Sequence, residues 1–273
     1  MKKSAYIYGV LNALKTWEYC FGFGVIIISV ILTLVLKITY NNIEHGAINL
    51  FITGTMEGNV LLQITAPVLP IFVCINNKSI FACKNKNEIL TFYKSKRVLV
   101  QVLTNVTIGI SVFILSFLFI LFAVLILFPG SAGGAEQQIG FFKELYAASP
   151  TLFIFVYIIH AAICGGAYAL LGTSLKLLFG RTDIALFVPL VFYGCFSRIV
   201  DAMPIFAQMV YYITPMYTFD IASIDVPLEK NVAEIAFVII MGLTMLYSSY
   251  RKHHKLLLNH KERIANVEDT GAF

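Results

Sequence analysis

Long apolar segments constrain the fold of this chain more than any other feature. The hydrocarbon core of a bilayer is about 30 Å thick, so a spanning helix needs about 20 mostly apolar residues. With 59% hydrophobic and only 13% charged residues, the chain carries more apolar surface than one water-soluble core can bury. We therefore predict an all-α, polytopic membrane protein with six transmembrane helices: Phe21–Tyr40, Asn59–Cys83, Val98–Phe128, Pro150–Leu175, Ile184–Ile199 and Val232–Tyr250.

Two of these segments contain signals for where a helix begins or bends. Pro67 and Pro70 lie inside the second segment and predict kinks there, because proline lacks the N–H that a helical hydrogen bond needs. Ser149 and Pro150 stand at the start of the fourth segment in the order typical of a helix N-terminus, a capping residue followed by proline.

Positive charges alternate along the six segments. Sixteen of the 20 Lys and Arg residues lie before the first segment, around the connection from the second to the third, between the fourth and fifth, or after the sixth. Because Lys and Arg are enriched in cytoplasmic loops, this alternation predicts a cell-membrane protein with both termini in the cytosol. The same distribution accounts for the net charge of +5 without nucleic-acid binding.

Stretches outside the six segments also have characteristic patterns. Residues 1–20 should form a cytosolic interfacial helix, because apolar side chains recur at helical spacing over Ser4–Trp17. Residues 251–273 should form a basic cytosolic tail, helical at first and loose at Glu268 and Asp269.

The transmembrane domain, residues 21–250, is predicted to contain one irregular part. Val200–Asn231 is rich in apolar and aromatic residues but is interrupted by Pro204, Pro215 and Pro227. Non-helical backbone is tolerated at membrane depth only where protein surrounds it. We expect re-entrant helices between the fifth and sixth spans.

Motifs of soluble enzymes are missing from the sequence. It contains no GxxxxGK[ST] phosphate loop, no HExxH, no GxSxG and no pair of zinc-type cysteine spacings. We predict that the chain itself is not an enzyme and has no catalytic residue, metal site or cofactor of its own.

One histidine lies in the middle of the fourth segment. His160 and Cys164 are one helical turn apart and could present two ligands on one face, but no third ligand is suggested. His160 is interpreted either as a histidine hydrogen-bonded inside the bundle or as a residue of a substrate path, since ionisable residues at membrane depth are functional candidates. Small residues beside it predict close helix packing: Ala161, Ala162, Gly165, Gly166, Ala169 and Gly172.

The connection Asn76–Arg97 combines six positive charges with an apolar face formed by Ile89, Leu90, Phe92 and Tyr93. A solvated linker would not need that face. The pattern favours a short cytosolic helix that presses on the membrane or on a partner, and a plain surface helix is the alternative.

Together these features resemble the permease subunit of a type-2 ABC exporter. The resemblance comprises an interfacial N-terminal helix, six spans, a basic helical loop after the second span, a small basic loop after the fourth and re-entrant helices before the sixth. The stretch from Lys86 to Arg97 (KNEILTFYKSKR) is similar to the coupling loop of that family, in which an acidic residue precedes an apolar helix that a basic residue closes. It differs in having Ile89-Leu90-Thr91 where Gly-Thr-Leu is common, and in lacking a proline before Arg97.

The resemblance implies a division of labour between chains. A separate cytosolic ABC ATPase would bind ATP and Mg²⁺, and a second permease chain, identical or homologous, would complete the transporter in the bilayer. The cargo would be hydrophobic or amphipathic: a peptide, a lipid-linked molecule or a drug. Contact with the ATPase is implied for one set of residues: Lys86, Glu88, Phe92, Lys96, Arg97, Arg181 and Asp183. An outer gate or substrate path is implied for another: His160, Tyr211, Tyr212 and Tyr217.

Two other classes remain open from the sequence. The chain could be a non-transporting sensor or scaffold whose basic loop docks a cytosolic partner. An intramembrane enzyme is the third alternative, and His160 would then be essential for its reaction.

Overall fold

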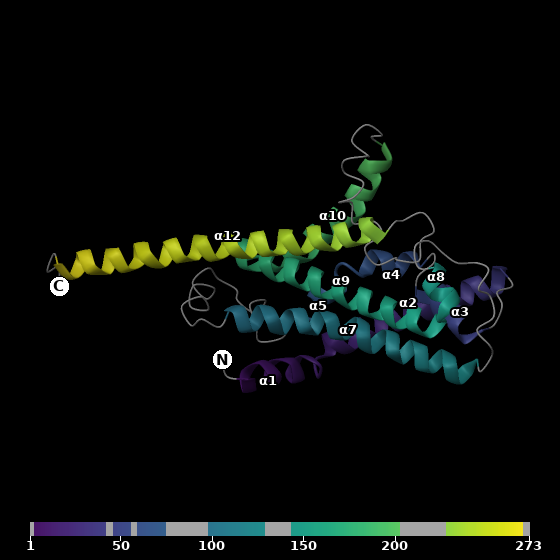
Figure 1. The fold of residues 1–273 in the computed structure, drawn as a ribbon. Helices are drawn as coiled ribbons and strands as arrows, with labels where there is room; N and C mark the ends of the chain where they lie inside the picture. The colour runs from purple at the N-terminus through teal and green to yellow at the C-terminus, as the bar shows by residue number, and fades with distance from the viewer. Residues whose placement is uncertain are drawn as a thin grey trace.

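The computed structural model describes residues 3–41, 46–55, 59–74, 98–128, 143–202 and 228–269. All regular structure in these ranges is helical, as predicted (Figure 1). The N-terminal third holds α1 (Lys3–Ala13), α2 (Trp17–Asn41), α3 (Ala47–Thr55), α4 (Val60–Thr65) and α5 (Leu69–Phe72). The remainder holds α7 (Val98–Leu127), α8 (Lys143–Ala148), α9 (Pro150–Phe179), α10 (Thr182–Ala202) and α12 (Leu228–Asp269).

Four of these helices are long and apolar enough to cross a membrane, which is the pattern of a multi-pass membrane protein. The candidate spans are Trp17–Leu36, Val98–Leu127, Pro150–Phe179 and Asn231–Leu256. They correspond to the first, third, fourth and sixth predicted segments, and the third and fourth begin at the predicted residue. The fold class is therefore confirmed in its coarse form, an all-helical chain with several apolar spans.

The fourth segment forms the centre of the bundle. In α9, 67% of the most apolar window is buried, against 22–39% in the other three candidate spans. Side chains of α5, α7, α10 and α12 pack on it, and Phe117 of α7 stacks on Tyr157 with ring centroids 5.5 Å apart. The predicted start is confirmed, because the Ser149 hydroxyl accepts a hydrogen bond from the Leu152 N–H at 3.3 Å.

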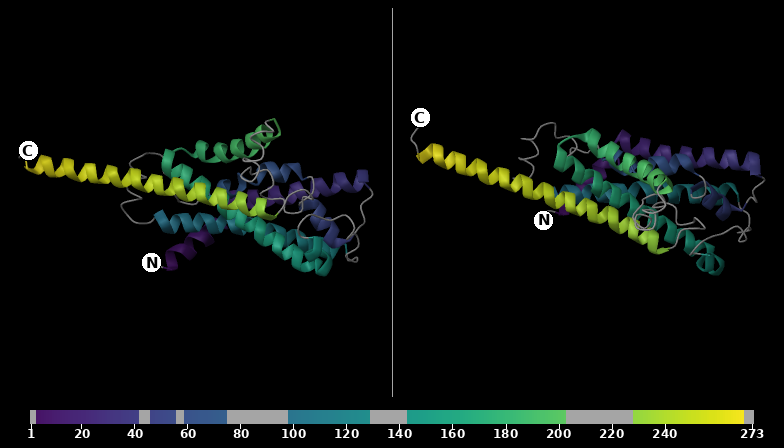
Figure 2. Two further views of the ribbon diagram at one scale, coloured as in Figure 1. Left: turned by 45° about the horizontal axis from the view of Figure 1, so that its top comes forward. Right: turned by 90° about the horizontal axis from the view of Figure 1, so that it is seen from above.

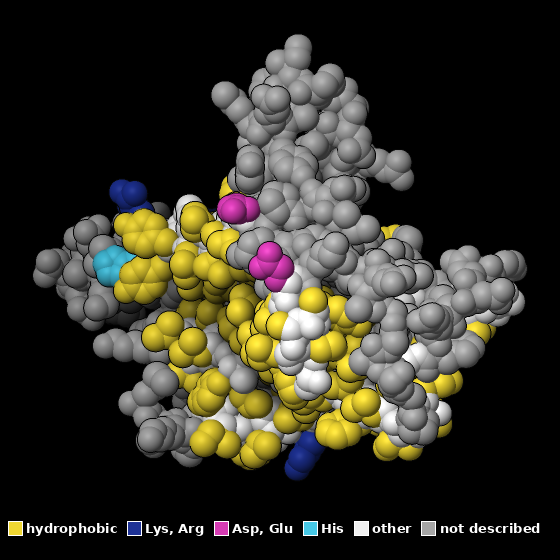
Figure 3. All heavy atoms as spheres, turned by 45° about the vertical axis from the view of Figure 1, so that its right-hand side comes forward, with side chains coloured by type: hydrophobic (Ala, Val, Ile, Leu, Met, Phe, Trp, Pro, Cys, Tyr) yellow, Lys and Arg dark blue, Asp and Glu magenta, His cyan; other side chains and the backbone are white. Residues whose placement is uncertain are grey.

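The less buried spans turn apolar side chains outward. On α2, Ile28, Ile31 and Val35 are more than half exposed, and on α7 so are Phe119 and Phe122. One face of the molecule shows hydrophobic side chains over most of its described surface (Figure 3). Such a surface is stable in contact with lipid rather than water.

Close approach of α7 and α9 depends on two glycines. A methyl group built on Gly165 would lie 2.6 Å from the Gly109 carbonyl oxygen, and one built on Gly109 would lie 2.7 Å from the Gly165 carbonyl oxygen. Neither position has room for a side chain, because backbone atoms cannot move aside cheaply. The predicted packing role of small residues in this segment is confirmed at this contact.

The second predicted segment is not one continuous helix in the described residues. Helix α4 ends at Thr65, the chain turns over residues 66–68, and α5 begins at Leu69. Pro67 and Pro70 were predicted to kink a helix, and instead they accompany a break, since Pro70 occupies the first turn of the new helix. Residues 75–83 of the predicted segment lie outside the described residues.

Helices α3, α4 and α5 nevertheless lead the chain back along α2. Gly54 lies against Val30 and Leu34 of α2, and Gly22 near the start of α2 lies against Val73. Asn59, between α3 and α4, contacts Ser29 near the middle of α2. The broken segment therefore runs antiparallel to α2 from one end of the bundle to the other.

The fifth predicted segment lies within α10, and Thr182–Phe192, the part of α10 whose side chains are described, is a short apolar helix. Within the described part of the chain, four long apolar helices are thus present where six were predicted. Most of the predicted re-entrant region, residues 203–227, lies outside the described residues.

Helix bounds at the two termini differ from the prediction. Helix α1 ends at Ala13, and Trp17 opens α2 instead of closing the interfacial helix, because the Thr16 hydroxyl caps α2 by accepting the Tyr19 N–H at 3.4 Å. At the other terminus, Glu268 and Asp269 were predicted to be loose and are instead helical, as the last residues of α12. At 1.5 Å per residue, the 42 residues of α12 span about 63 Å, so the helix projects well beyond the bundle (Figure 2).

Candidate functional site

Basic side chains gather at one end of the bundle. We call this the basic end and define it by Lys176, Arg181, Arg251, Lys252 and Lys255. It is formed by the start of α7, the last turn of α9, the start of α10 and the part of α12 that leaves the bundle (Figure 1). Glu144 and Glu229, both exposed, lie at the opposite end, where α9 and α12 begin.

A tight corner joins α9 to α10 at the basic end. Gly180 adopts a positive φ of 76°, which glycine tolerates without strain, and its N–H donates to the Lys176 carbonyl oxygen at 2.8 Å. The Lys176 ammonium group is buried and donates to the Gly180 carbonyl oxygen at 3.2 Å and to the Thr182 hydroxyl at 2.9 Å. A buried cation with these two acceptors fixes the geometry of the corner.

Arg181 and Asp183, two of the predicted ATPase contacts, form an exposed ion pair on this corner. The Arg181 Nε donates to the Asp183 Oδ1 at 3.1 Å, and a second hydrogen bond joins Nη2 to Oδ2. Hydrogen bonding from the guanidinium lowers the pKa of the Asp183 carboxyl and raises the pKa of Arg181. Both groups are therefore charged at neutral pH and are presented to solvent as a fixed dipole.

Helix α12 holds the end of α9 from the side. The Lys252 ammonium group donates to the Leu178 carbonyl oxygen at 3.2 Å, and the His253 Nε2 lies 3.2 Å from the Leu177 carbonyl oxygen. These carbonyls belong to the last turn of α9, where a helix leaves its acceptors unpaired. Positive charge there also complements the negative end of the helix dipole.

The start of α7 meets the same place. Leu177 of α9 and Val102 of α7 form a small buried cluster, on which Val98 and Leu246 also pack. Val98 directly follows the predicted coupling loop, and Leu177 precedes the α9–α10 corner by a few residues. The residues that adjoin the two predicted ATPase-contact regions therefore pack beside each other in the bundle. Lys86, Glu88, Phe92, Lys96 and Arg97 themselves lie outside the described residues.

A second polar feature lies at the break between α3 and α4. Asn59 is buried and caps α4, because its side-chain oxygen accepts the Leu62 N–H at 2.9 Å. Its amide nitrogen donates to the Gly54 carbonyl oxygen at 2.7 Å, and the Tyr157 hydroxyl donates to the Thr55 carbonyl oxygen at 3.0 Å. Side chains thus satisfy backbone groups that the break exposes within the bundle.

His160 lies half-buried on α9, one turn before the fully buried Cys164. Glu234 of α12, which was not among the predicted site residues, is fully buried and close enough to interact electrostatically with the Cys164 thiol. Asn231, one turn earlier on α12, is also buried. In the described ranges no three His, Cys, Asp or Glu side chains are grouped as metal ligands would be. The predicted gate residues Tyr211, Tyr212 and Tyr217 lie outside the described residues.

Two of these residues carried a signal in the sequence. Asn59 directly precedes an apolar run, as an N-cap does, and Lys176 precedes a Gly at the end of an apolar segment, as a C-terminal cation does. Glu234 carried no such signal, because nothing in its neighbours shows which face of α12 is buried. Comparison of the chain with protein-family models, curated proteins and solved structures finds no significant match.

Proposed function

We propose that this chain is the membrane-spanning permease subunit of an ATP-driven ABC exporter. In this proposal the chain lies in the cell membrane with both termini in the cytosol, and it crosses the bilayer six times. The discontinuous α3–α5 segment and α10 supply the second and fifth crossings. The cargo is hydrophobic or amphipathic, and a second permease chain completes the pathway.

One observation supports the proposal more than any other. The start of α7 and the end of α9 pack on each other through Val102 and Leu177, at the end of the bundle that carries the basic residues. The loop Lys86–Arg97 precedes the first of these elements, and the Gly180–Asp183 corner follows the second. A single cytosolic ATPase could therefore touch both regions at once, and a movement of that ATPase would act on the two most closely packed spans.

The rigidity of the corner supports the same function. A coupling element must transmit force without deforming, and Lys176 ties the corner internally through two hydrogen bonds. ATP-driven rocking would transport cargo if the cargo's affinity differed between the two states of the permease.

Affinity capture from the native membrane tests this function. The tagged full-length chain, solubilised in a mild detergent, is expected to bring down a protein with a phosphate-loop sequence. Asp183→Lys reverses one exposed charge on the corner and is expected to reduce recovery of that ATPase at least about tenfold, as interface charge reversals do. Recovery is measured by quantitative mass spectrometry.

Glu144→Lys is the matched control, since it makes the same charge change on an exposed residue at the opposite end. It is expected to leave ATPase recovery unchanged. Capture of no ATPase under conditions that keep the chain monodisperse would contradict the proposal. Capture of a different cytosolic protein, lost in Asp183→Lys, would support the scaffold alternative instead.

A further inference from the structure

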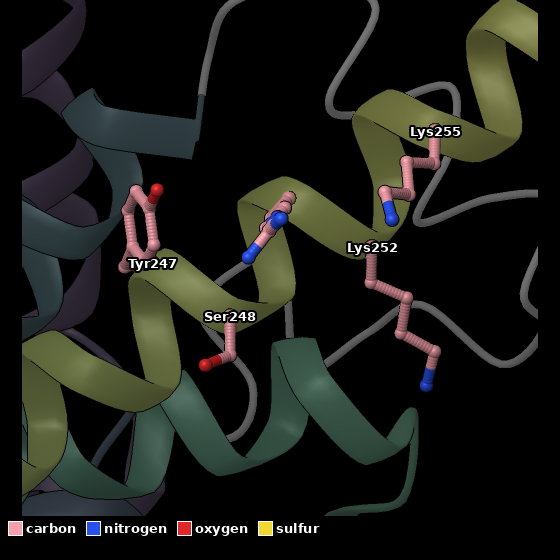
Figure 4. A pocket seen from close by; sticks show the side chains of 5 residues that line it. Tyr247, Ser248, Lys252 and Lys255 are labelled. Atoms are coloured by element: carbon pink, nitrogen blue, oxygen red, sulfur yellow. The ribbon is translucent and has the colours of Figure 1, made fainter.

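An open groove lies on α12 where this helix leaves the bundle. It is lined by Tyr247, Ser248, Arg251, Lys252 and Lys255 (Figure 4). The positions form two adjacent rows at four-residue spacing, Tyr247–Arg251–Lys255 and Ser248–Lys252, so they lie on one side of the helix. All five residues are exposed, so the groove is accessible from the surroundings.

The groove is strongly electropositive. Three of its five lining residues are cations, and the sequence contains no Asp or Glu between Glu234 and Glu262. Tyr247 and Ser248 add hydroxyl donors at its inner end. Ammonium and guanidinium groups with neighbouring hydroxyls are the donor set that binds phosphate oxygens.

An apolar surface continues from the groove toward the centre of the span. Leu243 precedes Tyr247 by four residues and Ile240 precedes Leu243 by three, so they extend the same face of α12. Leu243 is 52% exposed and Ile240 is 60% exposed. A free phosphate would use only the cations, whereas a phospholipid would use both the cations and this apolar strip.

The position of the groove along α12 fits the same ligand. The groove lies in the last turns of the candidate span Asn231–Leu256, and its cations are the first Lys or Arg residues after Lys230. They therefore lie at the level where lipid headgroups meet the hydrocarbon core. Tyr247, at the inner side of the groove, is the residue type enriched at that level. Lys and Arg beside the end of a span attract anionic headgroups.

We propose that this groove binds the phosphate of an anionic phospholipid, with its acyl chains along Ile240 and Leu243. The phosphate accepts hydrogen bonds from Arg251 and Lys255, and Lys252 contributes charge while remaining hydrogen-bonded to the Leu178 carbonyl oxygen. The bound lipid therefore lies beside the last turn of α9. The inference requires only that the chain lies in a membrane, and it is independent of the ATPase proposed above.

Native mass spectrometry of the purified full-length chain tests this site. Phosphatidylglycerol and phosphatidylcholine of the same acyl composition are titrated in separate experiments, and the apparent Kd is measured for each. Arg251→Gln combined with Lys255→Gln is expected to weaken phosphatidylglycerol binding about 25-fold, which is about fivefold for each charge removed. Phosphatidylcholine binding is expected to stay unchanged.

Lys15→Gln combined with Arg181→Gln is the matched control, since it removes two exposed charges that lie outside the groove. An equal loss of phosphatidylglycerol binding in this control would overturn the proposal, as would equal affinity of the wild-type chain for the two lipids. Wild-type binding should also weaken between low and high salt, because surface electrostatic attraction is screened. This measurement needs no variant, and binding that is independent of salt would overturn the proposal.

The source of the phosphate is distinguished by competition. Glycerol phosphate and inorganic phosphate, which have the anionic group without acyl chains, are expected to displace phosphatidylglycerol only at concentrations at least a hundredfold higher, roughly as the loss of a few buried methylene groups predicts. Displacement at equal concentration would overturn the lipid assignment in favour of a free phosphate.

Discussion

Gly165→Leu is expected to eliminate the folded, monodisperse protein. The contact between α7 and α9 brings the two backbones together at this position, and a methyl group alone would lie 2.6 Å from both the Gly109 carbonyl oxygen and the Phe113 ring. Overpacking a core costs about 1–3 kcal/mol when side chains can adjust, and here the obstacle is backbone. Because the free energy of unfolding of a domain is only about 5–15 kcal/mol, separating the central helix α9 from α7 should be enough to unfold the bundle.

Size-exclusion chromatography with a fluorescent fusion measures the effect directly. Gly24→Leu is the matched control, since nothing lies within 4 Å of the methyl group that would be added there. It should give the wild-type elution profile. A normal, thermally stable peak for Gly165→Leu would contradict the close contact of α7 and α9.

Asn59→Leu is expected to lower the free energy of unfolding by about 2–4 kcal/mol, the sum of a lost helix cap and a buried carbonyl left without its donor. Leucine has nearly the shape of asparagine but can neither accept the Leu62 N–H nor donate to the Gly54 carbonyl oxygen. Water cannot replace these bonds inside the bundle, because Asn59 is only 1% exposed. Denaturation in mixed micelles measures the difference.

Asn12→Leu makes the same chemical change on an exposed position of α1, and it should alter stability by less than about 0.5 kcal/mol. Equal stability of Asn59→Leu and the wild type would show that the break between α3 and α4 does not depend on this side chain.

Hydropathy was sufficient to predict the four long helices, because each of them is one uninterrupted apolar run. The length of such a run is visible in the sequence whether or not its side chains are buried. Val98 and Pro150 were predicted as helix starts from a change of composition and from a capping pattern, and both were confirmed. The broken segment was different. A hydropathy window averages over Gly54, Asn59 and Pro67, whereas the chain responds to each of them by ending or restarting a helix.

The candidate site was only partly predictable for a related reason. Arg181 and Asp183 were selected through the resemblance to an ABC permease, and the structure adds that they pair with each other on a corner fixed by Lys176. The contact between α9 and α12 depends on which faces of the two helices meet. Apolar residues surround α9 almost evenly, so its sequence does not show which of its faces packs on α12. Glu234 therefore carried no sequence signal of its contact with α9, although it is buried and close to Cys164.

Cysteine labelling of intact cells tests most directly that this bundle lies in the membrane with its basic end in the cytosol. Single cysteines replace Glu144, Glu229, Asp183 or Lys255 in a chain whose five native cysteines have been substituted. Glu144→Cys and Glu229→Cys are expected to react with a membrane-impermeant maleimide added outside. Asp183→Cys and Lys255→Cys should react only after the membrane is permeabilised, and the reverse pattern, or equal labelling at both ends in intact cells, would contradict this arrangement.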